Sequence, residues 1–388
     1  MRGMTGLRHQ TQITLGFVPL LDAAPLIVTQ AKGFAVKEGL DLRLLREMSW
    51  AALRDRISIG HIDAAHMPAP LPIATTLGLG SLPVALETPI GLATGGNAIT
   101  VSEGLWRRMR DSGAPEAAGD PISCGRALKR VLEACQKQLA RPLVFGVVHP
   151  FSSHNYELRH WLSAVSIEPD RDVQITILPP PFMVDALEAG RIDGYCVGEP
   201  WNSLARQHGS GRIVTTKNRL WPGAIEKVLA TRSGALDADV TRRLITAITR
   251  AANWCDEARN RDELAELLAQ PDYMGLPSHC LLPGLSGALM LGDAPTSLEP
   301  NFLRFGGSAT APLPSQALWL YAQMLRWQQT SFSPQDAERA AAVYRTNLWY
   351  EATGLALPEP FSITTFDDVH FDAGQIQTWL AQYAACVE

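Results

Sequence analysis

A strand–helix–strand–helix–strand pattern near the start of the chain is the feature that most constrains its fold. Residues 13–18 alternate between apolar and small or polar side chains, as a half-buried strand does, and Asp22 can cap the helix that follows. Residues 40–45 alternate again, and residues 51–59 predict a second short helix. Residues 60–63, which read Gly-His-Ile-Asp, then turn into a third, buried strand. This order predicts an α/β unit.

The same pattern returns later in the chain. Residues 143–148 predict its first strand, and Ser152 or Ser153 can cap the helix that follows. Residues 173–178 predict its second strand, residues 183–189 a short helix and residues 190–193 the closing turn. The closing turn reads Gly-Arg-Ile-Asp, and Ile192 follows Leu143 by 49 residues, just as Ile62 follows Ile13. The matched pattern predicts two similar α/β lobes, each with a doubly wound mixed sheet. The alternative is that any parallel α/β chain repeats at this scale; the paired Ile-Asp turns favour two lobes.

The composition and the predicted secondary structure of the chain change beyond the second segment. Residues 237–270 are rich in Ala, Arg and Glu and predict helix, whereas residues 276–314 are rich in Gly and Pro and predict irregular structure. Residues 315–328 predict another helix, and Ser333 followed by Pro334 is a typical helix start. We expect this region to wrap around one lobe and to contribute nothing to a site.

Composition and charge exclude several classes of protein. Hydrophobic residues make up 46% of the chain and the net charge is −5 without a basic stripe, so we expect a globular protein that does not bind nucleic acid directly. No apolar run approaches the ~18 residues of a membrane span. The N-terminal residues also lack the apolar run of roughly 7–15 residues that a secretion signal needs. We therefore expect a cytoplasmic protein, unless a leader has been removed.

The chemistry-bearing residues form no known catalytic or metal motif. The six cysteines are scattered without a Cys-x-x-Cys pair, which favours reduced structural thiols over zinc or disulfides. His149 and His154 are spaced so that they do not share a helix face. No Gly-x-Ser-x-Gly, P-loop or Gly-x-Gly-x-x-Gly motif is present. We expect no metal, no cofactor and no enzymatic activity.

The segments that follow the predicted strands are the candidate site. In doubly wound sheets, ligands bind beyond the carboxyl ends of the strands, and helix N-termini in that place favour anions. The segments are residues 22–24, 49–50, 66–67, 152–154 and 198–201. We expect a small anion to bind between the lobes.

Several of these segments, with others, resemble a known family. They are residues 17–25, 49–51, 63–67, 96–100, 154–159, 197–202 and 226–229. Together they look like the nitrate- and bicarbonate-binding proteins of cyanobacterial-type ABC transporters and their soluble relatives. The resemblance implies a two-lobed fold of the periplasmic-binding-protein type II, with the ligand in the interlobe cleft. We expect one lobe to comprise residues 11–100 and 225–388, and the other residues 101–224.

Within this family the chain is most similar to the cytoplasmic nitrate/nitrite sensors of the NasS type. That resemblance implies that it holds an ANTAR-domain, RNA-binding antiterminator of the NasT type in check and releases it when nitrate or nitrite binds. Two alternatives stay open. One is an exported receptor of a nitrate ABC transporter. The other is an enzyme like the thiamine-pyrimidine synthases, for which Cys196, His66 and His154 would be the reactive cluster.

The resemblance places ligand contacts at Trp50, His154 and Lys227. Indole and imidazole N–H groups can donate to an oxyanion, and a lysine entering an apolar segment needs a partner of opposite charge, such as a monoanion. From the residues alone, a core tryptophan, a capping-region histidine and a surface lysine are the alternative interpretations. The bicarbonate-binding relatives differ at the lysine, which favours nitrate or nitrite.

The remaining candidates are His66, Met67, Gly96, Asn97, Glu199, Pro200 and Trp201. Gly96 and Asn97 offer backbone and amide donors, or simply form a turn. His66 and its neighbour end a short strand and would line the floor of the cleft. Since a carboxylate facing an anion is unfavourable, we expect Glu199 to pair with a basic group or to brace the hinge.

Overall fold

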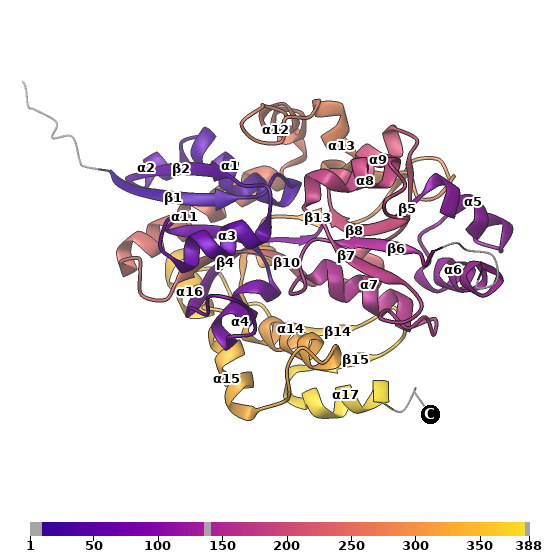
Figure 1. Cartoon of the computed structure of the whole chain (residues 1–388). Coiled ribbons are helices and arrows are strands. Elements are labelled where there is room, and N and C mark those ends of the chain that lie inside the picture. Colours follow the sequence, from indigo (N-terminus) through magenta and orange to yellow (C-terminus); the bar gives the residue numbers. More distant parts are fainter. Residues whose placement is uncertain (1–9, 136–140, 385–388) are drawn as a thin grey trace, which may run out of the picture.

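The computed structural model describes residues 10–135 and 141–384, which form two α/β lobes (Figure 1). The expected two-lobed fold class is confirmed. Residues 1–9, which hold most of the segment judged to lack a leader, lie outside the described residues, as does Cys386. Among the described helices, none combines the length and the apolarity that a bilayer crossing requires.

Each lobe is built on one central sheet. The strands of the first sheet are β1 (Thr11–Phe17), β2 (Leu40–Arg46), β3 (Ala64–Pro68), β4 (Leu86–Gly95), β10 (Ile225–Arg232) and β13 (Leu303–Arg304). Those of the second are β5 (Asn97–Ser102), β6 (Val144–Val147), β7 (Gln174–Ile177), β8 (Gly194–Gly198) and β9 (Gly211–Thr216). The spatial orders are β13-β4-β10-β3-β1-β2 and β7-β6-β8-β5-β9.

The two sheets share one arrangement of strands. In the first, β1 lies parallel between β2 and β3, and in the second β6 lies parallel between β7 and β8. The next strand in each sheet is antiparallel: β10 beside β3, and β5 beside β8. Each antiparallel strand directly follows a connection from the other lobe. The two connections therefore enter the sheets at interior strands and not at their edges.

The Ile-Asp turns fix the same contact in both lobes. The backbone N–H of Thr14 donates to Asp63 Oδ2 at 2.8 Å, and that of Val144 donates to Asp193 Oδ2 at 2.8 Å, each across 49 residues. Both aspartates also donate their own N–H back, to the carbonyls of the same partners. The repeated spacing therefore ties the first strand of each lobe to the turn before its third strand.

The chain passes between the strands of one central sheet and those of the other at two places, after β4 and after β9. The first crossing is at Gly95 and Gly96, which have φ of 72° and 84°; a Cβ at Gly95 would lie 2.1 Å from the Phe302 carbonyl oxygen, so glycine is required there. This crossing precedes the expected boundary at residue 100 by a few residues, because all of β5 pairs with the second sheet. The second crossing runs through α10 (Lys217–Leu220) into β10.

Helices cover both sheets, and those that the sequence predicts begin close to the predicted positions. They are α1 (Ala24–Ala31), α2 (Phe34–Lys37), α3 (Trp50–Ser58), α4 (Pro70–Leu77), α5 (Glu103–Asp111), α6 (Pro121–Cys135), α7 (Ser153–Ser163), α8 (Met183–Glu188), α9 (Trp201–Gln207), α11 (Ala238–Asp256), α12 (Arg261–Leu268), α13 (Ser278–Ser286), α14 (Pro314–Arg326), α15 (Pro334–Ala342), α16 (Thr346–Thr353) and α17 (Ile376–Ala384). Ser152 and Ser333 cap α7 and α15, as predicted.

Two local predictions are wrong. Asp22 does not cap α1: it lies in a short 3₁₀ turn, η1 (Leu21–Ala23), and its carboxylate is engaged by long-range ion pairs. Residues 276–314 are not wholly irregular, because they contain α13, which includes Pro283. Long-range packing outweighs the local composition in both places.

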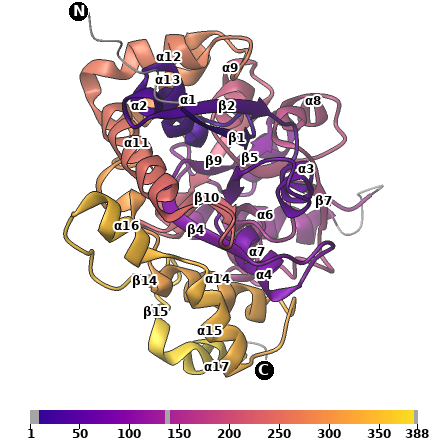
Figure 2. The ribbon, with the colours of Figure 1, turned by 90° about the vertical axis from the view of Figure 1, so that its left-hand side faces the viewer.

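The C-terminal region contacts both lobes instead of one, and α15 and α17 lie at the bottom of Figures 1 and 2. In the first lobe, β13 pairs with β4, and Arg345 contacts Glu87. In the second lobe, Tyr156 Oη donates to Gln329 Oε1 at 2.6 Å, and His160 Nε2 lies 2.8 Å from an Asp367 oxygen. This region therefore bridges the two lobes.

Candidate functional site

Side chains from both lobes meet in the interior, close to the crossings. Trp50 begins α3 and His66 lies on β3, in the first lobe, and His154 lies in the first turn of α7, in the second. Lys227 is on β10, just after the second crossing. All four are fully buried. The structure thus brings together four of the residues that the sequence singled out, from segments far apart in the chain.

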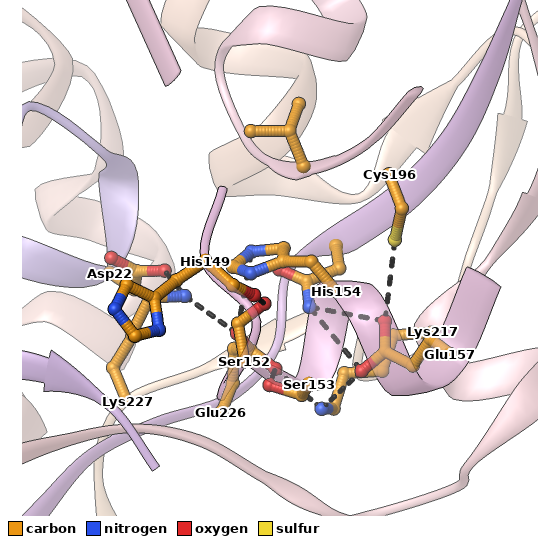
Figure 3. A network of polar contacts seen from close by, with 12 residues as sticks. Asp22, His149, Ser152, Ser153, His154, Glu157, Cys196, Lys217, Glu226 and Lys227 are labelled. Carbon is orange, nitrogen blue, oxygen red and sulfur yellow. Dashed lines mark hydrogen bonds and ion pairs between the residues drawn. The ribbon is translucent and has the colours of Figure 1, made fainter. Parts of the chain in front are cut away.

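A chain of alternating charges runs through this site (Figure 3). Lys227 Nζ lies 3.0 Å from Asp22 Oδ2 and 2.6 Å from Glu226 Oε1. The other Glu226 oxygen lies 2.5 Å from Lys217 Nζ, which in turn lies 2.7 Å from Glu157 Oε1. We call these five residues, Asp22, Glu157, Lys217, Glu226 and Lys227, the charged cluster. Because Lys217 and Glu157 belong to the second lobe and the others to the first, the cluster links the lobes.

Neutral donors complete the cluster. Ser153 Oγ donates to Glu226 Oε2 at 2.6 Å, and Asn97 Nδ2 donates to Glu157 Oε2 at 3.1 Å. Full burial makes such contacts necessary, since a buried charge without partners is costly. The partner that Lys227 was expected to need is supplied within the chain by two carboxylates, so the lysine does not depend on a bound monoanion for neutralisation.

Burial and neighbouring charges set the ionisation of the cluster. Burial alone would raise the pKa of Asp22 and Glu226, but the nearby lysines outweigh it and lower both pKa values. Burial would likewise lower the pKa of Lys217 and Lys227, but the carboxylates raise it. Burial prevails at Glu157, whose pKa is raised. Both lysines and two of the carboxylates are therefore charged near neutral pH.

Burial keeps the histidines of the site neutral. Burial, reinforced by the charge of Lys227, lowers the pKa of His154 to about 3. Burial also lowers the pKa of His66, although its Nε2 lies 3.0 Å from Asp22 Oδ1. A neutral imidazole has one N–H donor and one acceptor.

Several buried polar atoms around Lys227 have no hydrogen-bond partner among the described residues. They are Trp50 Nε1, His66 Nδ1, both ring nitrogens of His154 and Asn97 Oδ1, whereas His66 Nε2 and Asp22 Oδ1 face each other at 3.0 Å. Lys227 Nζ lies 5.6 Å from the centre of the Trp50 ring, and the ring centres of Trp50 and His66 are 4.9 Å apart. Buried donors left unpaired are unfavourable. The arrangement suits a small molecule that presents several acceptor oxygens.

The remaining predicted residues surround this group. Met67 is buried on β3, opposite Val228 in register, and Gly96 forms the first crossing beside Asn97. Trp201 Nε1 donates across the lobes to the Pro19 carbonyl at 3.3 Å, and Pro200 precedes it at the start of α9.

Glu199 has no basic partner among the contacts that the structure describes. Its carboxylate accepts from the Ser203 N–H and hydroxyl, both at 3.1 Å. Its carbonyl oxygen accepts from the Leu21 N–H of the first lobe at 2.9 Å. Burial raises the pKa of this carboxyl to about 7. Of the two expectations for Glu199, pairing with a basic group is wrong, and its backbone instead joins the two lobes.

Cys196 does not form a reactive pair with a histidine. Its Sγ lies 3.7 Å from Glu157 Oε2, and burial, with the adjacent carboxylates, raises its pKa well above the usual value. A nucleophilic cysteine needs the thiolate. The geometry therefore does not favour the cluster of Cys196, His66 and His154 that an enzymatic role would use.

Asp22 lies in one of the candidate segments but was expected only to cap a helix, and three further cluster residues were not recognised from the sequence as site components: Glu157, Lys217 and Glu226. The available signal was a charged residue inside an otherwise apolar buried segment, as at Glu157 and Glu226. Such a residue needs an internal partner, but the sequence does not say which one.

Comparisons with known proteins agree with this fold. The sequence profile of the NMT1-like family matches residues 7–269. The chain is 36% identical over 356 residues to the nitrate import ATP-binding protein NrtC of Synechocystis sp., covering 90% of this chain and 51% of the relative. It is 33% identical over 383 residues to the bicarbonate transport ATP-binding protein CmpC of Synechococcus elongatus, covering 95% and 55%. The chain thus spans about half the length of these curated relatives.

A solved structure matches over nearly its whole length. The crystal structure of the periplasmic nitrate-binding protein NrtA from Synechocystis PCC 6803 superposes with a TM-score of 0.87 at 26% identity, covering 96% of this chain and 98% of that one. The profile match spans well over half of the sequence. The chain therefore belongs to the NMT1-like family.

Proposed function

We propose that this chain binds a small monovalent oxyanion, nitrate or nitrite, between its lobes, and that it carries out no chemistry on it. The observation that carries the proposal is the convergence of unpaired buried donors on Lys227: Trp50 from one lobe and His154 from the other. Nitrate is planar and accepts hydrogen bonds at three oxygens, so it can engage donors from both lobes at once. Such a ligand favours the closed form because its contacts are complete only there.

The relatives that are named for nitrate support the choice of anion. A relative named for bicarbonate makes that planar monoanion the main competitor. Sulfate and phosphate are bulkier and can carry two charges, which this site does not balance.

Isothermal titration of the chain with nitrate, nitrite, bicarbonate and sulfate tests the proposal. We expect saturable one-to-one binding of nitrate or nitrite and no heat with sulfate. Binding of bicarbonate alone would replace nitrate as the ligand, and the absence of heat with all four anions would refute the proposal.

We further propose that the chain acts as a cytoplasmic sensor, which releases an ANTAR-domain antiterminator when the anion closes the lobes. The support is the resemblance to sensors of the NasS type, and linkage requires a partner of the open form to be released by a ligand of the closed form. The alternative is a receptor that delivers the anion to an ABC transporter, which the named relatives favour. Co-purification with an ANTAR-domain protein, lost when nitrate is added, would support the sensor; its absence, with binding to a permease, would support the receptor.

A further inference from the structure

The charged cluster carries no surplus positive charge for an anion. It contains two lysines, Lys217 and Lys227, against three carboxylates. Even with Glu157 protonated, which its raised pKa favours, the charges only cancel. A monoanion entering this buried place would therefore add one uncompensated negative charge, which is strongly unfavourable.

Two histidines in contact with the cluster can supply the missing positive charge. His66 Nε2 lies 3.0 Å from Asp22 Oδ1, and His154 Nε2 lies 3.5 Å from Glu226 Oε1. Of the two, His154 is the less tightly held, because its nearest carboxylate oxygen lies 3.5 Å away, whereas that of His66 lies at 3.0 Å, and its ring nitrogens have no hydrogen-bond partner among the described residues. A proton on His154 would make both nitrogens donors, one for the carboxylate and one for the anion.

We propose that the anion binds together with one proton from solvent, which the imidazole of His154 takes up. This inference rests on the proposed function and specifies the ligand as a monoanion accompanied by a proton. Neutral His154, the anion and one proton become an imidazolium beside the anion, so the net charge of the buried site is unchanged. A dianion would require a second proton, and the cluster would then discriminate against it.

The charged and titratable groups around His154 come from every neighbouring element. Glu226 and Lys227 lie on β10, Asp22 lies in η1 and Lys217 lies on α10, while Glu157 is one turn further along α7 itself. The two lysines disfavour a charged imidazole and the carboxylates favour it, and the lysines together with burial prevail. A bound anion adds one more negative charge beside the ring and so favours the protonated imidazole of His154.

Proton uptake can be measured by titrating the whole chain with nitrate at pH 6.5 in two buffers with different heats of ionisation, such as Bis-Tris propane and imidazole. We expect the observed heat to depend on the buffer with a slope of about one proton per nitrate, and the affinity to fall by up to about tenfold per pH unit at higher pH. Heats that do not depend on the buffer, with an affinity that is constant from pH 6 to pH 8, would overturn the inference. No binding at all would instead refute the proposed function.

A matched pair of variants tests the assignment to His154. His154→Gln keeps an N–H donor but does not titrate, so we expect proton uptake to fall close to zero. His208→Gln alters an exposed histidine beside Glu188 and should keep the uptake of the unmodified chain. Unchanged uptake in His154→Gln would overturn the assignment.

A second measurement covers the case in which His154→Gln does not fold or bind. In the unmodified chain labelled with ¹⁵N-histidine, nitrate should shift both ring nitrogens of His154 to imidazolium values. A neutral tautomer of His154 in the nitrate complex would overturn the inference.

Discussion

The same turn in the two lobes carries opposite chemistry. After β1, residues 22–24 place the Asp22 carboxylate against Lys227 and His66. After β6, residues 152–154 place a capping serine, a serine that donates to Glu226, and His154, whose ring nitrogens have no hydrogen-bond partner in the described part of the chain. The repeated spacing gives the two lobes the same backbone arrangement, and the side chains at each turn determine what that turn contributes to the site. One lobe holds the lysine in place, and the other lobe supplies neutral donors.

Removing Lys227 should have the largest effect, because this lysine is shared by carboxylates of the charged cluster. Lys227→Ala leaves Asp22 and Glu226 buried without their shared cation, which should cost about 3–5 kcal/mol of unfolding free energy and abolish anion binding. A lysine that only contacted a ligand could be removed without loss of stability, whereas we expect the loss of Lys227 to destabilise the fold. Denaturant unfolding and calorimetry provide the measurements. Lys37→Ala, at an exposed lysine, is the control, and wild-type stability together with intact binding in Lys227→Ala would contradict the role of the cluster.

Glu199, whose backbone joins the two lobes, should make the stability of the protein depend on pH through its buried carboxyl group. Its pKa in the folded state is raised to about 7, so it stabilises the fold fully below its ordinary pKa, and this stability is lost as the pH rises through about 7. Glu199→Gln keeps an acceptor for Ser203 but cannot ionise. It should be more stable than the unmodified chain at pH 8 by about 1–3 kcal/mol and equal to it near pH 4. Melting curves of both proteins at the two pH values provide the measurement, and a constant difference would contradict the prediction.

The paired aspartates of the repeat should behave alike. Asp63→Ala and Asp193→Ala each remove the acceptor of a strand N–H, at an expected cost of about 1–2 kcal/mol. Asp193 also pairs with Arg141 at 2.7 Å, so its variant should lose at least as much. Chemical denaturation of both variants provides the test. If one aspartate could be removed at no cost, the two turns would not be equivalent.

Trp50 should affect binding through its indole N–H. This Nε1 has no hydrogen-bond partner among the described residues, so the N–H that Trp50→Phe removes is free for the ligand. We expect the nitrate affinity to fall about tenfold, or about 1.4 kcal/mol, while the lost ring volume lowers the melting temperature as it does at any buried tryptophan. Trp319 Nε1 is also buried and unpaired but lies in the C-terminal aromatic cluster. Trp319→Phe should therefore leave the affinity unchanged, and an equal loss in both variants would argue against the Trp50 contact.

The fold could be predicted from the sequence because its signals are local. Alternation, capping serines and the repeated Ile-Asp turns each depend on neighbouring residues or on one fixed spacing. The role of Asp22 could not be predicted in this way, because an aspartate before an apolar run is typical of a cap and its true partner lies far away in the chain. The contact between Glu157 and Lys217 spans 60 residues and leaves no periodic trace. The bridging position of the C-terminal region likewise depends on long-range packing.

A crystal structure of the chain with nitrate tests the central claim most directly. We expect one nitrate whose oxygens lie within hydrogen-bond distance of Trp50 Nε1, a His154 ring nitrogen and Lys227 Nζ, so that a single ion contacts both lobes. A nitrate bound to one lobe alone, or away from these three groups, would contradict the claim.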